Sequence, residues 1–230
     1  MPENILNIFL LAIGASFIQR TTGFGFGIFI MTGLPFLMPS YAEAVTLSGL
    51  LSLTSSTVVM IKYLKYINWR RMLPILTAFF LTSTLAICLL ERIEGKSMRM
   101  ILGLLLIFLC LYFSFFKEKL QKMIRLTKRW QYGVGAASGI MGGLFGMQGP
   151  PVVLYLINSE PDKNCYMGMI QTYFVISNSM MTLVRASNGF ITEAVGKSYI
   201  LCLAAVVIGA GIGGWAFNRI PGKIFPYVVY

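Results

Sequence analysis

Histidine is absent from the sequence, and acidic residues are scarce: eight Asp and Glu residues stand against 19 Lys and Arg residues. The absence of histidine removes the usual proton shuttle at neutral pH and the commonest metal ligand. The four cysteines lie in apolar stretches without the spacing of a metal site. We therefore predict no metal site, no cofactor and no catalytic residues, while carboxylates such as Glu43 and Glu193 could still carry protons.

Charged residues of either sign are also few: they make up 12% of the 230 residues, where a soluble domain has about 25%. Hydrophobic residues make up 57%, and the mean hydropathy is +0.74. Long runs that are apolar on every face are stable only in lipid, and they differ from the alternating strands of a transmembrane barrel. The sequence predicts an all-α, multi-pass membrane protein whose partner is the lipid bilayer.

The net charge of +11 could suggest nucleic acid binding, but its distribution argues against that partner. Lys and Arg are concentrated in two segments between apolar runs, residues 62–71 and 117–129, whereas the segment 91–96 is nearly neutral. This is the pattern of the positive-inside rule. We predict that residues 62–71 and the basic loop 117–130 are cytoplasmic and that residues 91–96 are outside.

Two glycine-rich segments interrupt the apolar runs. In residues 19–27, three glycines at alternate positions follow a polar cluster; residues 142–151, about 120 residues later, combine four glycines with Gln148 and two prolines. Glycine costs roughly 1 kcal/mol and proline roughly 3 kcal/mol in a helix interior. We predict a broken helix at each segment.

The order of elements before the basic loop recurs after it, at an offset near 120–127 residues. We predict two homologous repeats of about four membrane segments each, residues 1–116 and 131–230, the second incomplete because its last segment is cut short. Weak repeats with paired, glycine-interrupted segments are typical of secondary transporters. If residues 5–39 cross the membrane once, the repeats are parallel; if they form a hairpin, the repeats are inverted.

A broken helix in a membrane frees backbone polar groups, which persist where they line a cavity. Glycine lets the backbone approach a ligand closely, and N–H groups at the start of a half-helix favour an anion. These features predict a small anion bound near the middle of the membrane. The candidate binding residues come from the two breaks and one later span: Gln19, Arg20, Thr21, Thr22, Gly23, Gly25, Gly27, Gly146, Gln148, Gly149, Pro150, Gln171 and Asn178.

Several of these residue types also have purely structural interpretations. The pairs Gly139–Gly143 and Gly209–Gly213 have the spacing of closely packed membrane helices, and packing is the preferred interpretation for the second pair. Packing is a weaker alternative for the two breaks, because proline and glutamine do not help helices to approach.

Long basic side chains and helix starts have structural interpretations as well. Arg20 could extend to the lipid headgroups instead of binding an anion, and this is the preferred interpretation for Arg185, which we place at the end of a span before a loop at residues 185–197. Ser40 and Glu43 have the spacing of a capping box, so we predict a helix start there.

Residues 19–27 (QRTTGFGFG) resemble the first-repeat signature of the TauE/SafE sulfite-exporter family of permeases, and residues 143–151 (GLFGMQGPP) resemble the second. Residues 67–71 and 218–221 are also similar to the family, and the likeness extends over nearly the whole chain. The resemblance implies a multi-pass transporter of a bacterial or archaeal plasma (inner) membrane, with eight spans in two repeats. It also implies sulfite, organosulfonates and related sulfur-containing anions as substrates. The chain departs from the family pattern in ending early and in having Gln148 where a small residue is common.

Our functional hypothesis is a secondary transporter of small anions. The alternatives are a passive anion channel and a membrane-embedded enzyme. An enzyme would need a nucleophile–base pair or a metal cluster at membrane depth, and we find neither. Assembly into a homo-oligomer is left open by the sequence.

Overall fold

The computed structural model describes residues 5–90, 93, 95–115, 127–160, 162–221 and 224–225, which form helices and turns and no strand. Two predicted features lie mostly outside these residues: the basic loop 117–130 and the last, shortened segment at the end of the chain. The elements are α1 (Ile5–Thr22), α2 (Phe26–Ile30), α3 (Leu34–Leu37), α4 (Tyr41–Met60), the 3₁₀ turn η1 (Leu64–Tyr66), α5 (Trp69–Leu90), α6 (Gly95–Phe115), α8 (Lys128–Phe145), α9 (Gly149–Ser159), α10 (Lys163–Ser187) and α11 (Glu193–Arg219).

Four of the described helices, α1, α4, α5 and α11, are long and apolar enough to cross a membrane. Large apolar side chains such as Leu81 and Leu85 are exposed on the outside, whereas serine, glutamine and asparagine side chains lie buried between the helices. This distribution suits a protein whose solvent is lipid, because lipid favours apolar groups outside and buried polar groups need partners inside. The predicted all-α membrane class is confirmed.

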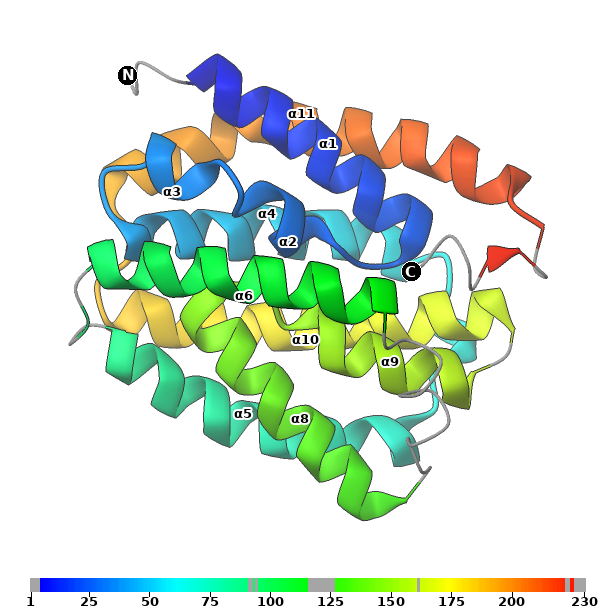
Figure 1. Cartoon of the computed structure of the whole chain (residues 1–230). Helices are drawn as coiled ribbons and strands as arrows, with labels where there is room; N and C mark the ends of the chain where they lie inside the picture. Colours follow the sequence, from blue (N-terminus) through cyan, green and yellow to red (C-terminus); the bar gives the residue numbers. More distant parts are fainter. Residues whose placement is uncertain are drawn as a thin grey trace.

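The helices run between two ends of the molecule, left and right in Figure 1. The right end is called the basic end, because the helix termini and turns there carry Lys62, Lys65, Arg70, Arg71, Lys128, Arg129, Lys163 and Arg219. The left end, where α1 begins, is called the N-terminal end.

The segment that contains the first glycine cluster forms a hairpin. Helix α1 runs from the N-terminal end to the basic end, and α2 and α3 return toward the N-terminal end, where α4 begins (Figure 1). Helices α8 and α9 form a second hairpin, which enters from the basic end and returns to it. Residues 5–39 therefore do not cross the molecule once, and the single-crossing alternative is wrong.

Two helix pairs pack side by side along their length, α1 with α11 and α5 with α8. Gly209 and Gly213 of α11 lie against the backbone carbonyls of Ile13 and Phe17 in α1. The corresponding seam of α8 consists of Gly135, Gly139 and Gly143, which lie against the α5 backbone. Small residues let membrane helices approach this closely, so the packing role preferred for Gly209–Gly213 is confirmed, and Gly139–Gly143 has the same role.

The start of α4 agrees with the sequence prediction. Ser40 and Glu43 form a reciprocal capping box, in which the Ser40 Oγ accepts from the Glu43 N–H (3.2 Å) and the Glu43 carboxylate accepts from the Ser40 N–H (3.0 Å). The Glu43 carboxylate also accepts a hydrogen bond from the Thr192 hydroxyl at the start of α11 (2.6 Å). Glu43 is therefore a helix-start residue that joins two helices.

Residues 185–197 differ from their prediction as a loop. Helix α10 continues to Ser187, and α11 begins at Glu193 with Thr192 as its N-cap. Arg185 is 1% exposed and does not extend to the headgroups. The helix continues through Arg185 because its guanidinium finds backbone carbonyls inside the protein, as described below.

The glycine seam between α5 and α8 predicts a position-specific effect of an added methyl group. A Cβ at Gly139 would overlap the Thr82 hydroxyl and lie 2.6 Å from the Phe79 carbonyl oxygen, whereas a Cβ at Gly133 in the same helix would have no neighbour within 4 Å. We expect Gly139→Ala to lower the free energy of unfolding by about 1–3 kcal/mol through overpacking. Gly133→Ala should leave it unchanged or raise it slightly. Thermal unfolding in detergent compares the two; equal midpoints would contradict close packing at this seam.

A cavity between two chain reversals

The first chain reversal lies between α1 and α2. Gly23 and Gly25 have φ values of 91° and 93°, a left-handed conformation that glycine adopts without strain. The Thr22 hydroxyl donates to the Ile18 carbonyl (2.9 Å) and accepts from the Phe24 N–H (3.3 Å). The chain can therefore leave helix α1 inside the molecule with its local polar groups bonded.

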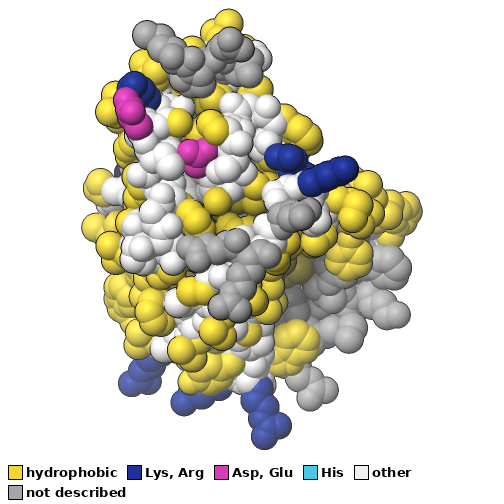
Figure 2. Space-filling view, turned by 90° about the vertical axis from the view of Figure 1, so that its left-hand side faces the viewer, with side chains coloured by type: hydrophobic (Ala, Val, Ile, Leu, Met, Phe, Trp, Pro, Cys, Tyr) yellow, Lys and Arg dark blue, Asp and Glu magenta, His cyan; other side chains and the backbone are white. Residues whose placement is uncertain are grey.

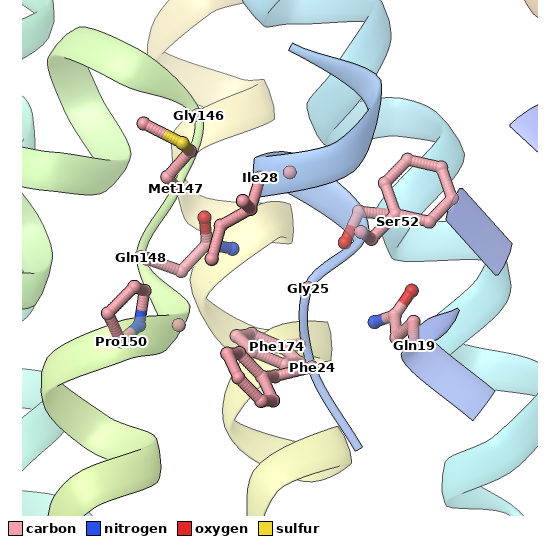
Figure 3. A pocket seen from close by; sticks show the side chains of 13 residues that line it. Gln19, Phe24, Gly25, Ile28, Ser52, Gly146, Met147, Gln148, Pro150 and Phe174 are labelled. Carbon is pink, nitrogen blue, oxygen red and sulfur yellow. The ribbon is translucent and has the colours of Figure 1, made fainter. Parts of the chain in front are cut away.

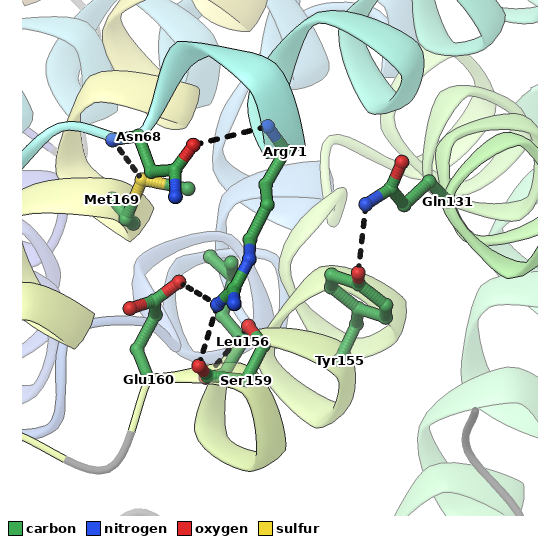
Figure 4. Close-up of polar contacts among 8 residues, drawn as sticks. All are labelled: Asn68, Arg71, Gln131, Tyr155, Leu156, Ser159, Glu160 and Met169. Carbon is green, nitrogen blue, oxygen red and sulfur yellow. Dashed lines mark hydrogen bonds and ion pairs between the residues drawn. The ribbon is translucent and has the colours of Figure 1, made fainter. Parts of the chain in front are cut away.

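The second chain reversal joins α8 to α9 and also contains a left-handed glycine. Gly146, with φ of 68°, ends α8, and its N–H donates to the Gly142 carbonyl (3.0 Å). Pro150 lies in the first turn of α9, where a missing N–H costs no helical hydrogen bond. The end of α9 is fastened at the basic end by Arg71 of α5, whose guanidinium donates to the Ser159 carbonyl (2.7 Å) and pairs with Glu160 (2.6 Å; Figure 4).

The two reversals meet in the middle of the protein. The Gly27 Cα lies so close to the Gly146 carbonyl that a Cβ at residue 27 would overlap it. A cavity of about 20 Å³ lies between the reversals, with walls from α1, α4, α9 and α10 as well. Seven of the predicted binding residues line it: Gln19, Gly25, Gly27, Gly146, Gln148, Gly149 and Pro150. In Figure 3, Gln148 points from the second reversal toward the first, and the Phe24 and Phe174 rings lie together beside it.

Gln19 connects the first reversal to two other helices. Its Nε2 donates to the Ser56 hydroxyl of α4 (2.7 Å) and lies 3.4 Å from the Gln171 Oε1 of α10. Gln171 in turn donates to the Gly23 carbonyl (2.8 Å). The Gln19 Oε1 is fully buried and has no hydrogen-bond partner within the described residues.

Gln148 connects the second reversal to the same two helices. Its Nε2 donates to the Asn178 Oδ1 of α10 (2.9 Å), and the Asn178 Nδ2 donates to the Ser52 hydroxyl of α4 (3.3 Å). Its backbone carbonyl accepts from the Ser138 hydroxyl, which also pairs with the Tyr173 hydroxyl (2.6 Å). Predicted residues Gln171 and Asn178 therefore lie behind the cavity wall and hold its amide groups in place.

The remaining predicted residues of the first segment do not line the cavity. The Thr21 hydroxyl donates to the Phe17 carbonyl within α1 (2.8 Å), and Thr22 and Gly23 form the reversal itself. Arg20 lies next to Gly213 and Gly214 of α11, on a different face of α1 from Gln19. It does not line the cavity between the reversals, because adjacent residues of a helix point in different directions.

Ser52 and Arg185 are residues of this region that the sequence did not reveal. Ser52 of α4 lines the cavity, two residues before a run of serine and threonine at residues 54–57. The Arg185 guanidinium donates to the Gly142 carbonyl (3.0 Å) near the end of α8 and to the Val45 carbonyl of α4 (3.2 Å). A cation is favoured at a helix C-terminus, where the last carbonyls have no helical partner.

The electrostatic character of this region is positive. Among the described residues, the buried charged side chains are Arg20 and Arg185, and neither forms an ion pair. Glu43 and Glu193 lie at the N-terminal end, away from the cavity, and Glu193 pairs with Lys197 (2.6 Å). The described residues also contain no group of acidic, cysteine or histidine side chains suited to a metal. The cavity thus has neutral amide groups in its described lining, and the buried charges of the described residues are positive.

Three comparisons relate the chain to known proteins. Residues 8–230 match the model of a protein family described as sulfite exporter TauE/SafE. The chain is also similar to a protein of Cupriavidus necator described as a probable sulfite/organosulfonate exporter TauE. The two are 28% identical over 228 residues, which cover 94% of this chain and 84% of that protein. No solved structure matches the chain.

The buried contacts of Arg185 predict its effect on stability. Arg185→Met would remove the guanidinium from the carbonyls of Val45 and Gly142, and a buried hydrogen bond from a charged donor contributes about 1.5–3 kcal/mol. We expect a thermal midpoint several degrees below that of the wild type. Lys197→Met is the control, because Lys197 forms an exposed pair that contributes little. Equal midpoints for the two variants would contradict a role of Arg185 in holding the end of α8.

Proposed function

The chain belongs to the TauE/SafE sulfite exporter family, and on this premise we propose that it is a secondary transporter of small sulfur-containing anions. Sulfite and organosulfonates are the substrates named for the similar Cupriavidus protein. The proposed location is the plasma membrane of a bacterium or archaeon. The family consists of exporters, so the prediction that the chain is not an enzyme is confirmed.

The observation that carries this proposal is the meeting of the two reversals at a cavity lined by amide groups. Gln19 and Gln148 approach it from opposite hairpins, and both are fixed through α10, by Gln171 and Asn178 respectively. In transporters, irregular backbone at membrane depth lines the substrate site. An oxyanion would accept hydrogen bonds from the two glutamine amides after these exchange their present partners.

The chain directions support inverted repeats as part of this proposal. The hairpin of α1 and α2 enters from the N-terminal end and that of α8 and α9 from the basic end (Figure 1). A shift of 123 residues carries Gly23 onto Gly146, both left-handed glycines at the end of a helix. In this correspondence α1 is equivalent to α8, and α5 is equivalent to α11. The packed pair α1–α11 is therefore equivalent to the packed pair α8–α5.

The cavity lies close to the centre of this proposed symmetry. The 123-residue shift carries Phe24 onto Met147 and Gly25 onto Gln148, and all four residues line the cavity. The two hairpins differ at this position of the cavity wall, since Gln148 has an amide side chain where Gly25 has none. Midplane sites at the repeat interface are typical of inverted-repeat transporters.

The distribution of charge supports an orientation with the basic end in the cytoplasm. The described residues of that end include eight Lys and Arg residues and two acids, Glu160 and Asp162. The described residues of the N-terminal end include three Lys and Arg residues (Lys96, Arg99 and Lys197) and two acids (Glu43 and Glu193), and Figure 2, in which this end faces the viewer, shows both kinds in its upper half. By the positive-inside rule the basic end faces the cytoplasm, and the N-terminus then lies outside.

The small size of the cavity favours a transporter over an open channel. A space of about 20 Å³ holds little more than one water molecule. A sulfite ion therefore enters only when the two hairpins separate. The pairs α1–α11 and α5–α8 are each joined by glycine seams, and we infer that they move as two rigid units about α4 and α10.

Flux measurements in proteoliposomes test the proposal. We expect saturable sulfite uptake with counter-transport, and a reduction of about tenfold or more in Gln148→Leu and Gln19→Leu, because a hydrogen bond to a charged group contributes about 1.5–3 kcal/mol. Gln131→Leu is the matched control, since Gln131 is also buried but donates to Tyr155 outside the cavity (2.9 Å; Figure 4). Flux that does not saturate would indicate a channel. Equal loss in all three variants would contradict the proposed site.

A further inference from the structure

We propose that a second cavity, between α1, α4 and α11 near the basic end, is a binding site for an oxyanion. It has a volume of about 370 Å³ and is separate from the cavity between the reversals. Its polar wall residues are Arg20, Lys62 and Asn218, and Trp215 lies beside them. The guanidinium and the ammonium are positively charged hydrogen-bond donors, and the amide adds neutral N–H donors and one acceptor oxygen. This set of groups is suited to a phosphate or sulfonate group.

Arg20 is the observation that points to a ligand. It is 5% exposed, and in the described part of the chain it forms no ion pair and no hydrogen bond. Its Nη1 is fully buried without an acceptor. Among the described residues its compensation comes from aromatic rings, with the Cζ 5.0 Å from the centre of Phe217 and 5.6 Å from that of Tyr63. Burying a charge without a partner is costly, so an anion in the cavity would supply what these residues do not.

The α11 wall leaves room for such a group. A Cβ at Gly211 would have no neighbour within 4 Å, and one at Gly214 would lie 3.3 Å from the Arg20 Nε. The absence of side chains at these two positions therefore exposes the guanidinium to the cavity. Lys62 is itself exposed at the end of α4, which places its ammonium at the mouth.

The mouth opens at the surface that faces lipid and water together. Val207 and Trp215, both lining the cavity, are 57% and 60% exposed. The Trp215 ring stacks with Arg219, whose Cζ lies 3.7 Å from its centre. Tryptophan and arginine at a helix end are typical of the headgroup level of a membrane. The oxyanion can thus arrive on a lipid headgroup or as a dissolved ion, and the binding chemistry is the same.

This inference does not rest on the transport of sulfur-containing anions, because Lys62, Trp215 and Asn218 do not line the cavity between the reversals. Its test can fail while the proposed transport stands, and the reverse also holds. The relevant variants are Lys62→Gln, which removes an exposed charge, and Gly211→Leu, which fills the cavity without changing any charge. Neither alters a buried contact of the protein.

The experiment measures binding to the full chain, purified in neutral detergent and stripped of lipid. The probes are a short-chain phosphatidylglycerol and, separately, inorganic phosphate and sulfate, with titration calorimetry as the readout. We expect saturable binding of at least one probe, weakened about tenfold or more by Lys62→Gln and by Gly211→Leu, since each removes a charge-assisted contact or the space for it. Lys65→Gln is the matched control, because Lys65 lies three residues away on η1 and does not line the cavity.

The two probes distinguish the source of the oxyanion. Binding of phosphatidylglycerol alone assigns the site to a lipid headgroup, and binding of inorganic phosphate or sulfate that competes with the lipid assigns it to a dissolved anion. The proposal is overturned if no probe binds saturably. It is equally overturned if Lys62→Gln and Gly211→Leu bind as tightly as Lys65→Gln.

Discussion

Backbone hydrogen bonding inside a membrane is the constraint on which this structure depends. Where the chain leaves a helix at membrane depth, its freed carbonyls need donors, because lipid offers none. Gln171 supplies a donor to the Gly23 carbonyl, Ser138 to that of Gln148, and Arg185 to that of Gly143. The side chains that stabilise the two reversals are therefore polar and buried. The same requirement brings amide groups to the centre of the protein, where we propose that an anion binds.

The helices around this centre have two structural roles: four of them form closely packed pairs, and α4 and α10 bond the reversals. Glycine seams hold α1 against α11 and α5 against α8, while α4 and α10 supply the serine, asparagine and glutamine side chains that fix the reversals. Close packing gives each pair rigidity, and the reversals are in tight contact where Gly27 meets the Gly146 carbonyl. In the proposed transport cycle this contact separates, and the glutamines exchange protein partners for the substrate. Arg20 and Arg185 keep the surroundings positive throughout.

Composition and spacing were sufficient to predict the all-α membrane class, the packing role of the glycine pairs and the capping box at Ser40, because each depends on local sequence. The wall position of Gln19 and Gln148 was also predictable, since both adjoin a glycine cluster. Arg20 and Arg185 were not, for a physical reason. Whether a long basic side chain extends to the headgroups or turns inward depends on carbonyls and rings from other helices, and those are brought near only by the fold. Ser52 lacked any local signal, and the hairpin form of residues 5–39 depends on how α2 packs against α4.

The most direct measurement is the position of a bound anion in crystals of the protein grown with selenite, whose selenium scatters anomalously and whose shape is that of sulfite. We predict a selenium peak between the amide groups of Gln19 and Gln148, with the two hairpins further apart than they are here. A second peak beside Arg20 and Lys62 would be compatible with that result. A peak beside Arg20 and Lys62 alone, with the cavity between the reversals unchanged, would contradict a substrate site between the reversals.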